Sequence, residues 1–147
     1  FGHPEWIDFP REGNDWTHHY ARRQWSLRDN KDLKFNQLGN FDEDMIKLNK
    51  KSLFKNSLNL KHIHEEDKIL AFERGDLLFC FNFHPNKSQP DYVIPSCSGK
   101  YELILNTDNP IYGGHDILRD VKPYFSHKDR LTLYIPARTG LVLKKEK

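Results

Sequence analysis

The chain has 147 residues and a formal net charge of +2, with 23 Lys and Arg against 21 Asp and Glu. Scattered, nearly balanced charges argue against a nucleic-acid-binding protein, which clusters its Lys and Arg, and no apolar run approaches the roughly 20 residues that span a bilayer. Only Cys80 and Cys97 are present, which excludes a disulfide scaffold and suggests a reducing, cytoplasmic compartment. The length predicts one domain, or one domain with part of another.

The first 18 residues are predicted to form a loop, because Pro4, Pro10 and Gly13 interrupt regular structure. The opening at Phe1 does not have the pattern of a signal peptide, and we expect it to be the interior of a longer protein. Residues 19–27 are predicted to form a short helix.

The clearest predicted helix spans residues 32–53. Asp29 or Asn30 is its expected N-cap, and Glu43 and Lys47 form a favourable i,i+4 pair. Apolar side chains recur at steps of mostly three and four residues and form one stripe. They are Leu33, Leu38, Phe41, Met45 and Leu48.

From Lys68 onward the pattern changes to short strands, after a polar stretch at 55–67 that predicts a connector or a domain boundary. An Arg74-Gly75-Asp76 turn between two apolar runs predicts a hairpin, and Leu77, Phe79, Phe81 and Phe83 fall on one face. The set predicts a small antiparallel sandwich. The expected strands are 69–73, 77–83, 101–105, 131–135 and 137–143, the last two paired through Pro136, with loops at 84–91, 95–100, 106–116 and 120–129.

Acidic and aromatic side chains crowd together at the start of the chain. Glycoside chemistry uses two carboxylates that flank the bond, and tryptophan rings offer flat faces to a sugar, so this segment has the composition of a sugar-binding wall. The same carboxylates can instead pair with neighbouring arginines, and spacing within a loop favours that structural interpretation. The residues are Glu5, Trp6, Asp8, Phe9, Glu12, Asp15 and Trp16, with Arg11, Arg22 and Arg23 as partners.

Other chemically active groups have simple structural interpretations. His18-His19 and His62-x-His64 lack the further ligands of a zinc site, so no metal is predicted. Asn82-Phe83-His84-Pro85 ends a strand and indicates a turn. Gly113-Gly114-His115 lacks the helix that follows a phosphate-binding loop, and Cys80 reads as an inert core residue.

Six sequence blocks resemble the C-terminal part of 1,4-α-glucan (glycogen or starch) branching enzymes, closer to the eukaryotic type than to the bacterial one. They occur in the family's order with similar gaps and cover nearly the whole chain, and the ordered set makes the resemblance specific. The blocks are FGHPEWIDFPREGN at 1–14, YARRQWSL at 20–27, FERGDLLFCFNFHPNKS at 72–88, GKYELILNTD at 99–108, YGGH at 112–115 and YIPART at 134–139.

The resemblance implies an α+β fragment: residues 1–58 would be the end of a catalytic (β/α)8 barrel, and residues 59–147 a C-terminal antiparallel all-β sandwich. It also implies the chemistry of glycoside hydrolase family 13 in glycogen biosynthesis. An α-1,4 linkage is cut and the chain is transferred to form an α-1,6 branch, through an Asp nucleophile and a Glu acid/base, with no cofactor. The implied partners are an α-glucan and the upstream barrel of the same polypeptide, with no nucleic acid and no membrane.

In the family the catalytic carboxylates lie upstream of the segment that matches Phe1. None of the carboxylates here is therefore expected to be catalytic, and the chain alone is expected to be inactive. The resemblance places residues 1–14 just after the last barrel strand, and the cleft of such barrels lies at the C-terminal ends of the strands. It thus implies that His3, Glu5, Trp6 and Arg11 wall the substrate cleft.

Two other interpretations stay open. The chain could be a stand-alone, non-catalytic α-glucan-binding β-module, whose loop aromatics would stack on sugar; the candidates are Tyr92, Tyr112, Tyr124 and Phe125. It could also belong to an amylase or debranching enzyme of the same superfamily, although the blocks at 20–27 and 72–88 argue against this.

Overall fold

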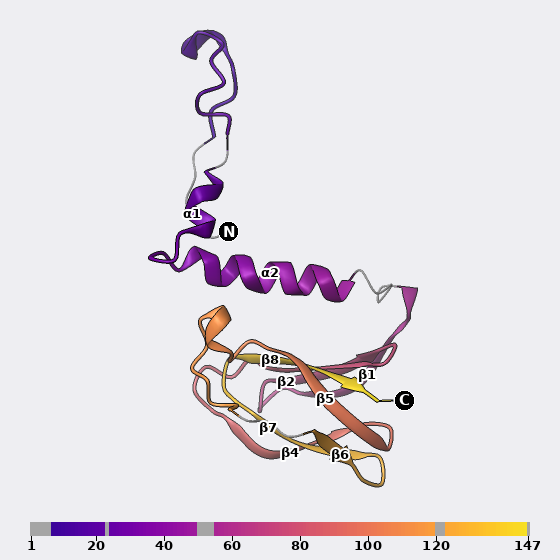
Figure 1. Ribbon diagram of the computed structural model, residues 1–147. Helices are drawn as coiled ribbons and strands as arrows, with labels where there is room; N and C mark the ends of the chain where they lie inside the picture. Colours follow the sequence, from indigo (N-terminus) through magenta and orange to yellow (C-terminus); the bar gives the residue numbers. More distant parts are fainter. Residues whose placement is uncertain (1–6, 23, 50–54, 120–122, 147) are drawn as a thin grey trace.

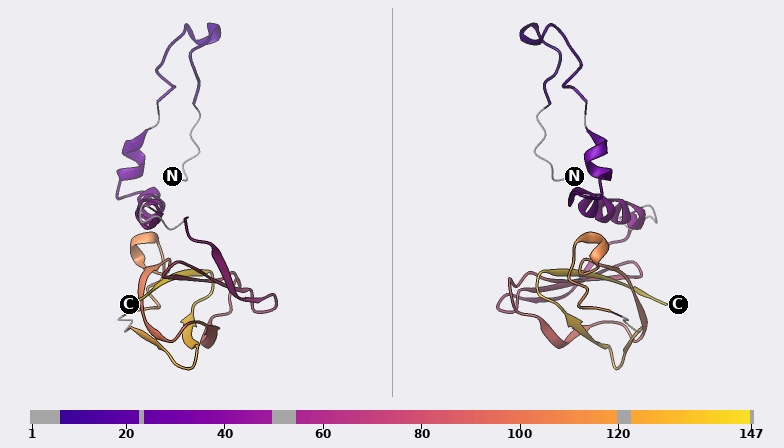
Figure 2. Two further views of the ribbon diagram at one scale, coloured as in Figure 1. Left: turned by 90° about the vertical axis from the view of Figure 1, so that its right-hand side faces the viewer. Right: turned by 60° about the vertical axis from the view of Figure 1, so that its left-hand side comes forward.

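The structure is a computed structural model that describes residues 7–22, 24–49, 55–119 and 123–146. A β-sandwich forms its larger part, a long helix lies across one face, and a short helix leads to an extended arm, residues 7–22, that stands away from the sandwich (Figures 1 and 2). The elements are η1 (Glu12–Asn14), α1 (Trp25–Asp29), α2 (Phe35–Asn49), β1 (Leu58–His64), β2 (Ile69–Arg74), β3 (Leu77–Asn82), β4 (Gln89–Pro95), β5 (Gly99–Asn106), η3 (Pro110–Tyr112), β6 (Tyr124–Ser126), β7 (Arg130–Ile135) and β8 (Thr139–Lys145).

Six strands form one sheet in the order β1-β2-β3-β8-β5-β6, and β4 and β7 form a second, two-stranded sheet. The pairings are antiparallel, which confirms the predicted sandwich. The predicted hairpin is also confirmed, because Arg74 pairs with Leu77 and Gly75 adopts the positive φ of 63° that its turn needs. The core between the sheets consists of Ile69, Ala71, Leu78, Cys80, Ile94, Tyr101, Leu131, Leu133, Ile135, Leu141 and Leu143.

A second apolar cluster lies on the outer face of the larger sheet and holds α2. Side chains alternate between the two faces of a strand, so Leu77 and Phe79 point outward while Leu78 and Cys80 enter the core. Phe41 and Leu48 of α2, seven residues and about two turns apart, pack against this cluster. The sheet is therefore apolar on both faces in β3, which explains the unbroken apolar run in the sequence.

The connector predicted at 55–67 is wrong, because most of it is the edge strand β1. Leu60 pairs with Phe72 and Ile63 with Leu70, and the register shifts between Leu60 and His62. This irregularity breaks the two-residue alternation that would have revealed a strand. The strand is also largely exposed, so its sequence mixes polar and apolar residues without a clear burial pattern.

Both predicted helices differ at their starts. The short helix begins at Trp25 rather than residue 19, and α2 begins at Phe35 rather than 32; its predicted end at 53 lies outside the described residues. Asn30 does not cap α2, because its side chain accepts from the Asp32 backbone N–H at 2.9 Å within a preceding turn. Among the described helices, none is long and apolar enough to cross a membrane.

Several predicted loops contain strand residues, including the loop at 95–100, where β4 ends at Pro95 and β5 begins at Gly99. Part of 84–91 belongs to β4, and β6 lies within 120–129. The expected pairing of the last two strands is also wrong: β7 pairs with β4, whereas β8 lies between β3 and β5. The chain changes sheets at Pro136–Arg138, where Pro136 is buried and Arg138 adopts a φ of 57°, so no tight hairpin forms there.

Candidate functional site

Of the four residues expected to wall a cleft, His3, Glu5 and Trp6 lie outside the described residues, and Arg11 lies on the arm. The Arg11 guanidinium donates to the Asp8 carboxylate from Nε at 2.9 Å and from Nη2 at 3.2 Å. The Asn14 amide also donates to Asp8, at 3.1 Å. Arg11 first, and then Asn14, lower the pKa of Asp8. Ion pairing, the structural interpretation of these charges, is therefore confirmed for Asp8 and Arg11.

The arm keeps its shape through polar contacts and turns its aromatic rings outward. The Asp8 backbone N–H donates to the Tyr20 carbonyl at 3.2 Å and joins the two limbs, and Asp15 and Trp16 reverse the chain with φ values of 52° and 55°. Phe9, Trp16 and Tyr20 are all exposed. Exposed aromatic surface of this kind is typical of a segment that contacts another surface.

The outer surface of β1, β2 and β3 is only partly covered by α2. Residues paired across antiparallel strands point to the same side, so Leu60 and Ile63 face the side of Phe72 and Leu70, but they are 55% and 62% exposed. Phe83 is 63% exposed and stacks on Phe81 with ring centroids 5.7 Å apart. We call Leu58, Leu60, Ile63 and Phe83 the open apolar face.

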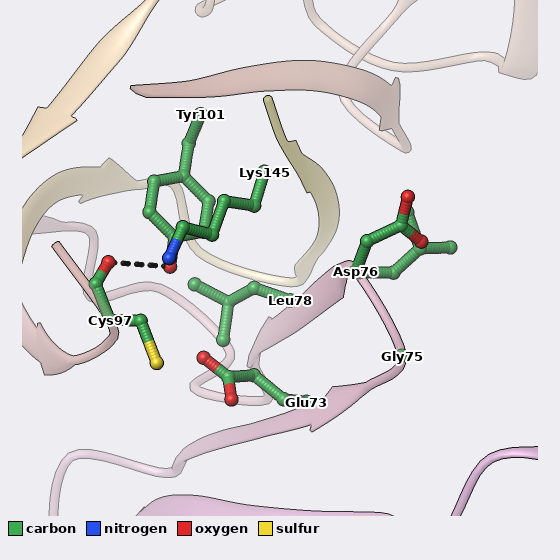
Figure 3. A pocket seen from close by; sticks show the side chains of 8 residues that line it. Glu73, Gly75, Asp76, Leu78, Cys97, Tyr101 and Lys145 are labelled. Carbon is green, nitrogen blue, oxygen red and sulfur yellow. Dashed lines mark hydrogen bonds between the residues drawn. The ribbon is translucent and has the colours of Figure 1, made fainter. Parts of the chain in front are cut away.

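A pocket of about 310 Å³ lies where the β2–β3 turn, the segment between β4 and β5, and the end of β8 meet (Figure 3). The Tyr101 hydroxyl donates to the Cys97 carbonyl at 2.9 Å. Glu73 forms an ion pair with Lys61, whose Nζ lies 2.9 Å from Glu73 Oε2. The Tyr101 hydroxyl and the Glu73 carboxylate therefore both have partners, and the pocket is a junction between chain segments with no evident catalytic pair among its lining residues.

Asp67, in the β1–β2 turn, joins the two sheets. Its Oδ1 accepts from Lys87 Nζ at 2.8 Å and from Gln89 Nε2 at 3.1 Å, and its Oδ2 accepts from the Tyr92 hydroxyl at 3.4 Å. The same hydroxyl lies 3.0 Å from His62 Nε2. Burial first, and then the charge of nearby His64, lower the pKa of His62. Within the described residues, no three His, Cys, Asp or Glu side chains are grouped to hold a metal ion.

We expect His62 to make the stability of the chain depend on pH. Its lowered pKa means that the unfolded chain binds the proton more readily than the folded chain does. The stabilising contribution of neutral His62 is therefore complete above the ordinary pKa of about 6.5 and is lost as the pH falls toward the lower folded-state pKa. His62→Gln keeps a polar side chain that can hydrogen-bond to the Tyr92 hydroxyl but does not titrate, so it should flatten this part of the stability curve. Urea midpoints of both proteins from about pH 7.5 to pH 5 test this expectation, and parallel curves would contradict it.

Residues 60–146 match the family described as alpha amylase, C-terminal all-beta domain, and the chain belongs to this family. An alpha-amylase from H. orenii has a similar fold, with a TM-score of 0.51 and 18% sequence identity over 88% of this chain and 24% of that chain.

Curated relatives extend the similarity beyond the β-domain. The 1,4-alpha-glucan-branching enzyme of Felis catus is 46% identical over 98% of this chain and 22% of its own length, and that of Dictyostelium discoideum is 46% identical over 99% and 23%. The chloroplastic/amyloplastic 1,4-alpha-glucan-branching enzyme of Oryza sativa subsp. japonica is 47% identical over 78% and 14%. The chain thus spans about a fifth of the length of the first two, and the resemblance to branching enzymes is confirmed.

The aromatics proposed for a free-standing sugar-binding module are mostly engaged inside the fold. Tyr92 and Tyr124 pack against the core, and Tyr112 packs in the outer cluster beneath α2. Only Phe125, at 71% exposed, is free to stack on a ligand among these four. The arrangement does not favour the module interpretation.

Proposed function

We propose that this chain is the C-terminal region of a 1,4-α-glucan branching enzyme, with residues 1–58 ending the catalytic barrel and residues 59–147 forming the β-domain. The observation that carries the proposal is the extent of the similarity. It covers 98% of the chain at 46% identity, whereas the β-domain family matches only residues 60–146. A free-standing β-module would have no use for the arm, which stands away from the sandwich.

The role proposed for the chain is to complete and support the barrel. The exposed rings of the arm and the open apolar face are surfaces that an apolar partner would cover. Because the chain corresponds to only 22% of the Felis catus enzyme, the rest of the same polypeptide is the natural source of that partner.

The reaction proposed for the whole enzyme cuts an α-1,4 linkage of an α-glucan and forms an α-1,6 branch with retention of configuration. Its carboxylates would lie upstream, where a nucleophile and an acid/base flank the bond. His3, Glu5, Trp6 and Arg11 would wall the cleft, and the bidentate contact with Asp8 would hold the Arg11 guanidinium in place. The free thiols of Cys80 and Cys97 are in keeping with a cytoplasmic location.

We expect the isolated chain to produce no branching above a control without protein. Fused behind the upstream part of the Dictyostelium discoideum enzyme, in place of that enzyme's matching segment, it should restore branching. The measurement is the loss of iodine-stained amylose absorbance. Branching by the isolated chain, or a chimera no more active than the upstream part alone, would overturn the proposal.

Paired variants of the chimera test the supporting role. Ile63→Asp with Phe83→Asp places two charges on the open apolar face and should abolish most of the activity, because buried charges without partners are costly. Phe125→Asp is the matched control, since Phe125 is at least as exposed but lies on β6 at the other edge of the sheet. Equal effects would contradict the role of this face, and tight glycogen binding by the isolated chain would favour the module instead.

A further inference from the structure

A polar contact as well as an apolar one holds α2 on the sandwich. The ring of Tyr112, in η3, meets Phe41 edge to face with centroids 5.6 Å apart, and its hydroxyl donates to Asp44 Oδ2 at 2.7 Å. Burial first, and then this hydrogen bond, raise the pKa of Tyr112 to about 12, so the hydroxyl keeps the proton that it donates. The contact therefore fixes one side of α2 to the segment between β5 and β6.

Charged contacts continue from Asp44 across α2 to α1. Lys47 Nζ lies 3.0 Å from Asp44 Oδ1 and 3.1 Å from Glu43 Oε1. The other oxygen of Glu43, Oε2, accepts from Arg28 Nη2 at 3.3 Å. Arg28 belongs to α1, so the path runs from the sandwich to the helix that follows the arm.

Gly39 allows this path to form, because it leaves room for Arg28 against α2. A Cβ at position 39 would collide with the Arg28 guanidinium and lie 3.1 Å from its Cγ. Glycine in the middle of a helix is unfavourable relative to alanine, and the close approach of Arg28 gives a reason for it here.

We propose that Tyr112 is a positioning residue that sets the angle of α1, the helix that follows the arm, relative to the β-sandwich. It acts through Asp44, Lys47, Glu43 and Arg28. The individual exposed ion pairs contribute little free energy, but together, as a continuous path of contacts, they select one orientation of α1. The functional consequence rests on the proposed function: the β-domain would then orient the cleft wall from a distance.

The orientation can be measured on the chain itself. Spin labels on Cys97, which is exposed, and on Ser26→Cys in α1 report the distance between sandwich and helix, and buried Cys80 will not be labelled. We expect a narrow distance distribution in the parent and a broad one in Tyr112→Phe. Asp44→Ala should broaden the distribution equally. The double variant should broaden it no further, because each substitution removes the same hydrogen bond between Tyr112 and Asp44.

The matched control is Tyr134→Phe, which removes a half-buried hydroxyl that makes no hydrogen bond with the described residues, and it should leave the distribution narrow. In the active chimera, Tyr112→Phe and Gly39→Ala should each lower kcat several-fold, while Tyr134→Phe keeps the parent rate. A narrow distribution in Tyr112→Phe overturns the inference whatever the activity. An inactive parent chimera overturns the proposed function, and the distance measurement then decides the inference by itself.

Discussion

Replacement of Asn82 by leucine is expected to lower the free energy of unfolding by about 3 kcal/mol or more. Asn82 is 1% exposed. Its amide donates to the carbonyls of Lys87 at 2.9 Å and Ile135 at 3.1 Å, and its oxygen accepts from the His84 N–H at 2.9 Å. Leucine has a similar size, but it would leave all three backbone groups without this partner, at about 1–3 kcal/mol for each group that stays buried.

Asn82 has this effect because it fastens the two sheets together: it lies on β3, whereas Ile135 ends β7 of the smaller sheet. The measurement is a urea or thermal unfolding curve. Asn59→Leu is the matched control, because Asn59 is an exposed residue of β1, and its change should stay within about 0.5 kcal/mol. Similar losses in the two variants would contradict the proposed fastening role.

Gly114→Ala should cost a comparable amount, about 3 kcal/mol, through steric conflict with the backbone. A Cβ at Gly114 would collide with the carbonyl group of Asp108. That carbonyl cannot easily move, because it accepts from the Asp116 N–H at 2.8 Å. The Asp108 carboxylate is also fixed, since it accepts from the backbone N–H groups of Leu118 and His115 at 2.8 and 3.2 Å.

Gly13→Ala is the matched control for this change. Its added Cβ would meet only the guanidinium of Arg11, an exposed and flexible side chain that can move aside. The difference between the two variants in denaturation midpoint therefore measures the rigidity of the loop around Asp108. If Gly114→Ala unfolds at the same denaturant concentration as Gly13→Ala, the close packing of this loop is not a source of stability.

Secondary structure is predicted most accurately from the sequence where burial leaves a pattern of apolar residues. Leu77 to Phe81 are apolar because the core and α2 cover both faces of β3. The predicted strand at 77–83 therefore agrees with β3 almost to the residue. β1 was missed because an edge strand with an irregular register and exposed side chains has no such pattern. The open apolar face was missed with it, although Leu58, Leu60 and Ile63 were visible in the sequence.

The candidate site was harder to predict, because its contacts join segments far apart in the chain. Asp8 and Arg11 lie three residues apart, so their pairing could be weighed from spacing. Tyr112 and Asp44 lie 68 positions apart, and no local signal marks them as partners. The resemblance to branching enzymes rests on ordered blocks of sequence rather than on any one residue. It therefore identifies the family but does not predict these individual contacts.

The position of β8 determines the order in which the molecule can be completed. β8 is the last strand of the chain, yet it lies between β3 and β5 in the larger sheet. Until it is synthesised, the β1-β2-β3 hairpins and the β5-β6 pair have no common neighbour, and two long strand edges stay unpaired. Open edges of this kind attract other chains, so we expect the partly synthesised sheet to be most prone to aggregation before β8 is available to pair with β3 and β5.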